Sequence, residues 1–174
     1  MFYQLTYDLS ETARRGVFAL LRAADHEFVP PLSARRGTTQ KDLLTAAAPP
    51  DGIAAYFAQL AGQACVLAME ESRVCGFLSF IPDHMLDALT PPLRCDYVST
   101  IVVDPACRGR GITAEMYRTL FSARPGHSAA TRTWSQNHAH LAVLRRLGFT
   151  PALTLADDRG PGIDTVYYIK TADA

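Results

Sequence analysis

The sequence predicts a mixed α/β protein, and three observations carry this prediction. Short segments rich in β-branched and aromatic residues alternate with segments whose apolar residues recur at helical spacing. Two apolar runs, Cys65–Glu70 and Val74–Ile81, are separated only by Glu71-Ser72-Arg73, which is the spacing of a hairpin. A further run, Asp96–Val103, leads through a glycine-rich loop directly into a helical pattern. The predicted order of elements is β-α-α-β-β-β-α-β-α-β-β.

The N-terminal third predicts one strand followed by helices. Phe2–Tyr7 alternates apolar and polar residues, as a strand does. Ser10 is a favourable N-cap for a helix that ends before Pro30-Pro31. After a loop, two short helical pieces are expected at Lys41–Ala47 and Gly52–Ala61. The inner face of the first helix is predicted to consist of Val17, Leu20, Leu21, Ala24 and Phe28.

The middle of the chain predicts a connection, a strand and a helix. A polar, proline-bearing connection is expected from Pro82 to Arg94, followed by the strand Asp96–Val103. A helix begins at Ile112, because Ile112, Met116 and Leu120 fall on one helical face.

The C-terminal third predicts three strands and one helix. A short strand, Ala129–Trp134, ends at Ser135, which is expected to cap the next helix. Gly148 stands where a glycine ends a helix in the left-handed conformation. Strands are then expected at Thr150–Leu155 and Asp164–Lys170, on either side of a turn rich in Asp, Gly and Pro.

The loop between the strand Asp96–Val103 and the helix that follows it predicts a phosphate site. Gly109 and Gly111 lack Cβ, so the backbone can adopt positive φ and approach a ligand closely. Arg108 and Arg110 add permanent positive charge. The first amides of the following helix have no intrahelical partner, and the helix dipole favours an anion there.

Two nucleotide-binding interpretations of this loop fit poorly. A P-loop requires a lysine after its second glycine, whereas no lysine follows Gly111 and the glycine spacing differs. Gly109–Ala114 matches the dinucleotide pattern G-x-G-x-x-A. That pattern needs an acidic residue about 20 positions further on to hold a ribose, and residues 130–134 contain none.

The same residues resemble the acetyl-CoA motif of the GNAT superfamily of N-acetyltransferases, Arg/Gln-x-x-Gly-x-Gly/Ala. Arg108 and Gly111 match this motif, and Thr113 stands where the family has Gly or Ala. The branched Cβ of Thr113 falls close to where the resemblance places the pyrophosphate. We therefore expect Thr113 to weaken or shift CoA binding.

A second segment resembles the other GNAT signature, Asn-x-x-Ala-x-x-x-Tyr-x-x-x-Gly-Phe. Asn137, Gly148 and Phe149 match at the right spacing, while His140 replaces the alanine and Leu144 the tyrosine. The resemblance implies that Asn137 hydrogen-bonds the pantetheine arm or orders a splay between strands. It also places Leu144 where the tyrosine meets the CoA sulfur, and leucine cannot donate a proton.

The resemblance implies a single GNAT-like domain over residues 1–174, with a mixed, mostly antiparallel central sheet flanked by helices. It implies acetyl-CoA as the acyl-donor cosubstrate. Backbone N–H groups of the strand 101–103 are expected to bind the thioester carbonyl as charge develops there. The residues expected to contact the cosubstrate are Ile101, Val102, Val103, Arg108, Gly109, Arg110, Gly111, Ile112, Thr113, Asn137 and Leu144.

The general base is less apparent from the sequence than the residues that contact the cosubstrate. Some GNAT enzymes carry a glutamate on the central strand, and Tyr97 occupies that place here. Tyrosine is a poor base at neutral pH, because its ordinary pKa is about 10. Asp96, Ser99 and Glu70 are therefore further candidates for a catalytic role. No base is needed if water relays the proton or if the acceptor amine has a low pKa.

The acceptor remains open at this point. Asp25, His26 and Glu27 could line its site, and their acidic groups would suit a cationic amine. Arg35 and Arg36 could instead favour an anionic acceptor.

Composition restricts the class of protein. The chain has 174 residues, a hydrophobic content of 48% and no net charge, which favours a soluble, cytoplasmic globular protein and argues against a nucleic-acid binder. No apolar run is long enough to span a membrane, and the N-terminus does not resemble a signal peptide. The expected partners are acetyl-CoA and an amine, with no nucleic acid and no membrane; a homodimer is left open.

Cysteine and histidine spacing does not indicate a metal. The four cysteines form no C-x-x-C pair and are expected to be reduced thiols. Cys107 lies beside Arg108 at a helix start, which favours its thiolate, but without a placed base we interpret it as incidental. His138 and His140 are two residues apart and point to different sides of a helix, so no metal is predicted.

Two functions are compatible with the sequence. The pair of GNAT-like signatures predicts an acetyl-CoA-dependent N-acetyltransferase acting on a small molecule or a protein amine. The departures at Thr113 and Leu144 leave an alternative, a non-catalytic acyl-CoA-binding sensor on the same fold.

Overall fold

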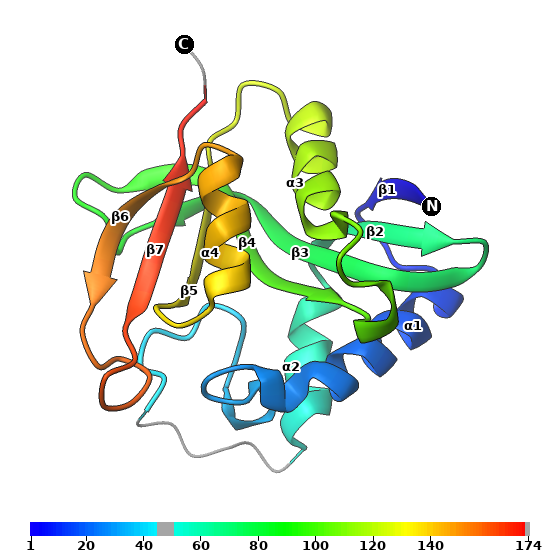
Figure 1. Cartoon of the computed structure of the whole chain (residues 1–174), viewed down its shortest axis with the longest axis horizontal. Coiled ribbons are helices and arrows are strands. Elements are labelled where there is room, and N and C mark those ends of the chain that lie inside the picture. Colours follow the sequence, from blue (N-terminus) through cyan, green and yellow to red (C-terminus); the bar gives the residue numbers. More distant parts are fainter. Residues whose placement is uncertain (45–50, 173–174) are drawn as a thin grey trace.

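A seven-stranded sheet with helices on both faces forms the centre of the computed structural model, which describes residues 1–44 and 51–172 (Figure 1). The strand order is β1-β2-β3-β4-β5-β7-β6. In chain order the elements are β1 (Phe2–Thr6), α1 (Glu11–Ala24), η1 (Asp25–Glu27), η2 (Leu32–Ala34), α2 (Gly52–Leu60), β2 (Ala64–Glu70), β3 (Arg73–Leu86), β4 (Leu93–Val103), η3 (Pro105–Cys107), α3 (Ile112–Ala123), β5 (Ala129–Trp134), α4 (His138–Arg146), β6 (Thr150–Leu155) and β7 (Thr165–Lys170).

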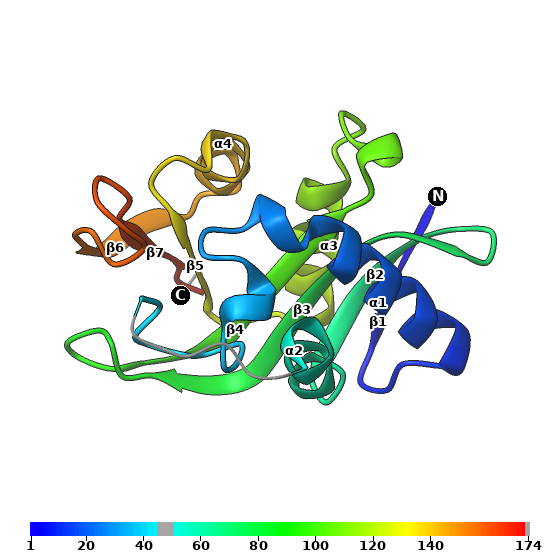
Figure 2. The ribbon, with the colours of Figure 1, turned by 90° about the horizontal axis from the view of Figure 1, so that it is seen from below.

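The sheet is mixed and mostly antiparallel, which confirms the predicted fold class. Only β4 and β5 are parallel neighbours, and they pair over just three residues each, Asp96–Val98 with Ala129–Thr131. Beyond this point the two strands diverge (Figure 2). The divergence leaves the remainder of β4 without a strand partner on that side.

A β-bulge lies at the point of divergence. Ser79 pairs with Thr100 whereas Phe80 pairs with Val98, so Ser99 is an extra residue in β4. A bulge increases local twist and redirects the strand. It therefore helps to turn the last residues of β4 away from β5.

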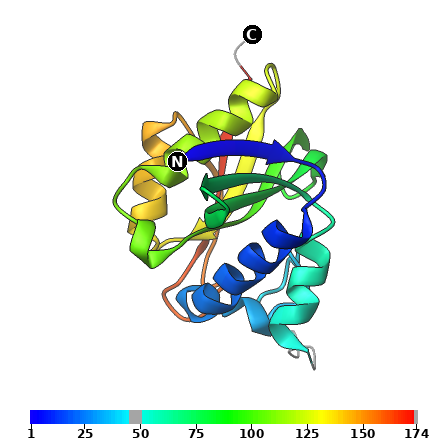
Figure 3. The ribbon, with the colours of Figure 1, turned by 90° about the vertical axis from the view of Figure 1, so that its right-hand side faces the viewer.

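The helices bury a separate core on each face of the sheet (Figure 3). On one face α3 and α4 pack through fully buried residues such as Met116, Tyr117 and Leu144. On the other face α1 and α2 pack through Val17, Leu21 and other apolar residues. The predicted cap Ser10 does begin α1, because its side chain accepts a hydrogen bond from the amide of Ala13.

Four predictions of secondary structure were wrong in detail. The helix after Ser10 ends at Ala24, so Phe28, which was predicted on its inner face, lies beyond it with an extended backbone. No helix forms at residues 41–44, the described part of the predicted piece Lys41–Ala47, whereas residues 45–47 lie outside the described residues. The expected connection from Pro82 to Arg94 is largely strand, since β3 runs on to Leu86 and β4 begins at Leu93. The fourth error concerns the cap of α4.

The extension of the β3–β4 hairpin has a physical reason. Leu86 pairs with Leu93, and Leu86, Cys95 and Tyr97 are buried in a third apolar cluster with Ala130 and Tyr167. These pairings join residues that are distant in sequence, so local composition does not reveal them.

Asn137, and not Ser135, caps α4. Asn137 Oδ1 accepts a hydrogen bond from the amide of His140 at 3.4 Å. Ser135 Oγ instead accepts from the amide of Asp164 at 3.1 Å. Both residue types are good N-caps, so the conformation of the turn that follows β5 determines which of the two caps α4.

None of the helices in the described part of the chain is long and apolar enough to cross a membrane. The four cysteines are free and buried, in agreement with the prediction of unpaired thiols.

Candidate active site

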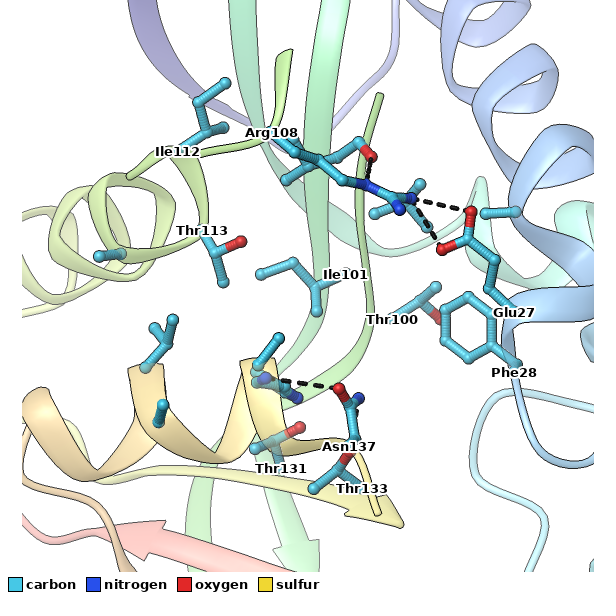
Figure 4. A pocket seen from close by; sticks show the side chains of 18 of the residues that line it. Glu27, Phe28, Thr100, Ile101, Arg108, Ile112, Thr113, Thr131, Thr133 and Asn137 are labelled. Carbon is cyan, nitrogen blue, oxygen red and sulfur yellow. Dashed lines mark hydrogen bonds and ion pairs between the residues drawn. The ribbon is translucent and has the colours of Figure 1, made fainter. Parts of the chain in front are cut away.

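A cleft of about 700 Å³ opens where β4 and β5 diverge (Figure 4). One side is formed by the predicted phosphate loop and the start of α3, and another by β5 and α4. The segment that follows α1 closes the remaining side. The residues that line the cleft include Glu27, Phe28, Arg35, Ser99–Val103, Cys107–Gly109, Gly111–Ala114, Thr131–Trp134, Asn137, Ala139, His140, Ala142, Val143, Arg146 and Arg159.

The unpaired edge of β4 directs backbone groups into the cleft. The amide of Asp104 donates to the carbonyl of Cys75 at 2.9 Å. Bonded and non-bonded pairs alternate along an antiparallel ladder, so Val102 also bonds to β3, whereas Ile101 and Val103 direct their backbone polar groups to the cleft. In agreement with this, Arg108 Nε donates to the carbonyl of Val103 at 3.1 Å.

The loop between β4 and α3 is an open cradle of backbone amides. Gly109 and Gly111 adopt φ of 77° and 75°, and a Cβ at either position would meet no atom within 4 Å. The first hydrogen bond of α3 runs from the amide of Glu115 to the carbonyl of Gly111. The amides of residues 112–114 therefore lack an intrahelical partner, and they lie at the positive end of the helix dipole. An anion fits this position.

The two arginines of the loop are already paired with carboxylates. Arg108 Nη2 lies 2.8 and 2.7 Å from the two carboxylate oxygens of Glu27, and both side chains are about half exposed. Arg110 Nη2 donates to Glu70 Oε1 at 2.8 Å, and Arg110 does not line the cleft. Backbone amides, rather than free arginine charge, are thus the main anion-binding groups of the loop.

Asn137 and Thr113 lie on the cleft wall, but Leu144 does not. Asn137 joins β5 to α4, because its Nδ2 donates to Thr133 Oγ1 at 3.0 Å while its Oδ1 caps the helix. Leu144 is fully buried in the core beneath α3 and α4. The side chain at this position therefore packs into the core and offers no group to the cleft.

Of the predicted catalytic candidates, Ser99 lines the cleft, whereas Glu70, Asp96 and Tyr97 do not. Arg110 holds the Glu70 carboxylate and keeps its pKa below the ordinary value. Asp96 is buried beyond the bulge, where it accepts from Arg124 Nε and Nη2 at 3.0 and 2.9 Å. Tyr97 is buried in the third apolar cluster, and burial raises its pKa.

A histidine on the cleft wall, His140, pairs with a buried tyrosine behind it, and the sequence did not predict this pair. The hydroxyl of Tyr117 on α3 lies 3.0 Å from Nε2 of His140 on α4. Burial lowers the pKa of His140 to about 4, so its imidazole is neutral at pH 7. Burial also raises the pKa of Tyr117. His140 stands at the alanine position of the signature, and that departure was the only signal for it.

The segment after α1 contributes only part of the predicted acceptor wall. Asp25 is buried, and its Oδ1 accepts from the amide of Ser33 at 2.7 Å, a role in the local fold. His26 and Arg36 are exposed and do not line the cleft. Glu27 and Arg35 do line it.

Arginines and aromatic rings form the wall beside this segment. Phe28 and Trp134 face each other with ring centroids 5.9 Å apart. Arg35 lies over Phe28 and Arg159 over Trp134. The sequence did not predict Arg159 as a residue of the cleft wall. Arg159 lies in a turn rich in Asp, Gly and Pro, where an arginine is ordinarily solvated.

Comparison with known proteins identifies the family and the fold. The model of the acetyltransferase (GNAT) family matches residues 30–149, more than half of the chain. No curated protein matches the chain.

Solved structures resemble the whole chain at low sequence identity. An aminoglycoside 6'-acetyltransferase type Ii is 16% identical with a TM-score of 0.71, covering 100% of this chain and 99% of its own. Ribosomal-protein-alanine N-acetyltransferase from Brucella melitensis is 18% identical with a TM-score of 0.67, covering 98% and 99%. The protein yncA from Salmonella typhimurium, solved with its cofactor acetyl-CoA, is 21% identical with a TM-score of 0.61, covering 98% and 94%.

Proposed function

The chain belongs to the acetyltransferase (GNAT) family, and from this premise we propose that it transfers the acetyl group of acetyl-CoA to an amine. One observation carries the proposal. A single cleft joins a cradle of free helix-start amides to the unpaired edge of β4.

The two parts of the cleft suit the two parts of the cosubstrate. The open space at Gly109 and Gly111 admits a diphosphate to the amides of residues 111–114. The backbone groups of Ile101 and Val103 would then pair with the amides of a pantetheine arm, as an additional strand pairs with a sheet edge. In this arrangement Asn137 ties the start of α4 to β5 by donating to Thr133.

The reaction needs a neutral amine, a polarised carbonyl and a proton for the departing sulfur. The amine nitrogen forms a bond to the acetyl carbon while the carbon–sulfur bond breaks, and the nitrogen loses a proton. Glu27, the one carboxylate among the lining residues that the structure describes, is held by Arg108. Glu70, Asp96 and Tyr97 lie outside the cleft. We therefore assign the proton transfers to water, with no side-chain base.

The comparisons leave the acceptor open. The names of two structural neighbours refer to an aminoglycoside and to a ribosomal-protein alanine. At these identities the likeness concerns the fold, so the choice of acceptor depends on the residues of this cleft.

A non-catalytic acyl-CoA sensor is the second candidate. The burial of Leu144 in the core and the paired state of Glu27 favour it, because the described cleft wall then offers neither the expected acid nor a free carboxylate base. Turnover separates the two candidates, since a sensor binds acetyl-CoA without releasing CoA.

A matched pair of glycine variants tests the proposal. Gly111 and Gly126 both have a φ of 75°, and a Cβ at either position would meet no atom within 4 Å, but only Gly111 lines the cleft. In calorimetric titration with acetyl-CoA, the wild type and Gly126→Trp should bind, whereas Gly111→Trp should not. Thiol release with an amine panel then tests turnover. Absence of binding by the wild type would overturn both candidates, and binding without turnover would favour the sensor.

A further inference from the structure

Three arginines from distant parts of the chain meet on the cleft wall beside Phe28 and Trp134. Arg35 follows η2, Arg132 lies on β5, and Arg159 lies in the loop between β6 and β7. The carbonyl oxygen of Val29 accepts from both Arg35 Nη2, at 3.4 Å, and Arg159 Nη1, at 2.6 Å. We call Arg35, Arg132 and Arg159 the arginine cluster.

Two members of the arginine cluster are shielded from solvent, and the third, Arg132, is half-buried. Arg35 is 6% exposed and Arg159 is 4% exposed, whereas arginine side chains ordinarily reach solvent. Burial and, after it, the charges of Arg35 and Arg132 together lower the pKa of Arg159 to about 9. Burial also lowers the pKa of Arg35. The fold thus keeps three like charges close together and leaves two of them poorly solvated.

No carboxylate of the described residues forms an ion pair with the cluster. Arg35 donates to the carbonyls of Pro30 and Val29, and Arg132 to the carbonyl of Gln40 and the hydroxyl of Tyr167.

Arg159 reaches a carboxylate only through a hydroxyl. Its Nε donates to Thr165 Oγ1 at 2.8 Å, and that hydroxyl donates to Asp158 Oδ2. Neutral acceptors satisfy the hydrogen bonds of the cluster but leave most of its charge uncompensated.

The rest of the cleft does not supply the missing negative charge. Glu27 is the one acidic residue on the described wall, and Arg108 already neutralises it. The aromatic rings of Phe28 and Trp134 cover one side of Arg35 and Arg159 respectively. A buried, uncompensated cationic wall of this kind is suited to an anionic ligand group.

We propose that the acceptor carries an oxyanion, such as the carboxylate of a free amino acid, beside its reactive amine, and that the arginine cluster binds this oxyanion. The proposal rests on the proposed acetyltransferase function. The anion compensates the cluster and fixes the orientation of the molecule, so that the amine lies beside the open edge of β4. A carboxylate and a phosphonate share the chemistry that the cluster recognises.

Matched sets of acceptors test the proposal. Each set contains an amino acid, its α-phosphonate analogue, its amide and the decarboxylated amine, for example leucine, its phosphonate, leucinamide and 3-methylbutylamine. In the sets that are turned over, kcat/KM for the oxyanion compounds should exceed that for the amide and the amine by about 10- to 100-fold, the worth of one charged hydrogen bond. The phosphonate separates a general oxyanion site from a strict carboxylate site.

Intrinsic reactivity works against this expected preference. An amino-acid amide has a less basic amino group than the free amino acid, so more of it is neutral and able to attack at pH 7. Equal or better turnover of the amide and the decarboxylated amine would overturn the proposal.

An arginine variant supplies the second measurement. Arg132 is half-buried, so Arg132→Gln disturbs the fold less than a change at Arg35 or Arg159. Arg132→Gln should raise KM for the amino acid by about 10- to 100-fold and leave both KM for the amide and the Kd of acetyl-CoA unchanged. Arg145→Gln on the exposed side of α4 is the charge-matched control and should behave as wild type. An unchanged KM in Arg132→Gln would overturn the proposal.

The two proposals can fail separately. Rapid turnover of amines without an oxyanion would keep the acetyltransferase function and overturn the inference. If no amine is turned over, the acetyltransferase function fails, and calorimetric titration of the same sets with the protein–CoA complex decides the inference. Binding of the amino acid without binding of the amide would support it, and any other result would overturn it.

Discussion

The loop side and the arginine side of the cleft are built in different ways. The loop side consists of β4 from Ile101 onward, the connecting loop and the start of α3, a single continuous segment that offers mainly backbone groups. The arginine side consists of side chains from several separate segments. In Figure 4, Thr113 lies on one side of Ile101 and Phe28 on the other.

This difference has a consequence for mutation. Backbone amides remain after most side-chain changes, so the loop side should tolerate substitutions that neither fill its space nor alter its φ angles. The arginine side should be sensitive to single changes, because each guanidinium makes several hydrogen bonds at once. Four predictions test this difference between the loop side and the arginine side.

Arg159→Met should have the largest effect on activity. The change removes a nearly fully buried charge and its bonds to Val29 and Thr165. We expect kcat/KM for an oxyanion-bearing acceptor to fall about 100-fold or more, from the loss of one or two charged hydrogen bonds. Calorimetry should show unchanged acetyl-CoA affinity, and thermal melts would report any loss of folding. A parallel loss of acetyl-CoA binding would show that the two sides are not independent.

His140, between the two sides, should make stability depend on pH. Its folded pKa of about 4 lies below the ordinary value of 6.5, so the unfolded chain binds more protons between these pH values. The unfolding free energy should therefore fall as pH drops from 6.5 to about 4, by up to about 1.4 kcal/mol per pH unit. Above pH 6.5 this contribution is fully present.

Denaturant titrations across this pH range measure the effect of His140. His140→Gln keeps a hydrogen-bonding group for Tyr117 and should flatten the pH dependence, whereas His138→Gln, exposed on the same helix, should not. Carboxylates with lowered pKa values, such as Asp83 and Asp104, are common to all three proteins and cancel in the comparison. Identical slopes in all three would contradict a poorly solvated, neutral imidazole.

Glu27→Gln should change the contact between the two sides. The Arg108–Glu27 pair is about half exposed on each partner, so its loss should cost less than about 1 kcal/mol of stability. The freed guanidinium lies at the loop, so acetyl-CoA should bind a few-fold more tightly at low salt, and the gain should shrink with added salt.

The exposed pair of Glu11 and Arg15 on α1 provides the control, since Glu11→Gln should leave acetyl-CoA binding unchanged. Weaker acetyl-CoA binding by Glu27→Gln would mean that Arg108 needs its carboxylate partner to keep the loop in place.

Thr113→Ala should have the smallest effect. The change removes a branched side chain from the cleft wall but keeps the amide that faces the proposed diphosphate. We expect acetyl-CoA affinity to rise by no more than about threefold, less than the worth of one hydrogen bond, with Thr119→Ala on the same helix as the control. A large gain would show that Thr113 obstructs the site and would favour the sensor function.

The sequence predicted the parts of the fold that depend on neighbouring residues. The apolar periodicity of α1 and its cap at Ser10, the positive φ at Gly111 and the β2–β3 turn all follow from local chemistry. Local chemistry could not choose between Ser135 and Asn137 as the cap of α4, nor extend β3 to Leu86, because both depend on pairing with remote strands.

The same distinction applies to the candidate site. Glu70, Asp96 and Tyr97 were attractive as bases by residue type and position, yet each is turned toward other partners, an arginine or an apolar cluster. Leu144 matched a cosubstrate position by spacing, but the rotation of α4 places it in the core.

By itself the sequence determined the loop side of the cleft, because a strand, two glycines and a helix start within one short segment fix the direction of their own amides. Only the tertiary structure decided the arginine side. Arg35, Arg132 and Arg159 are separated by long stretches of chain, and each alone resembles an ordinary solvated arginine. Their charge becomes a binding feature only when the divergence of β4 and β5 brings three guanidinium groups, two of them nearly fully buried, to one wall where no carboxylate of the described residues pairs with them.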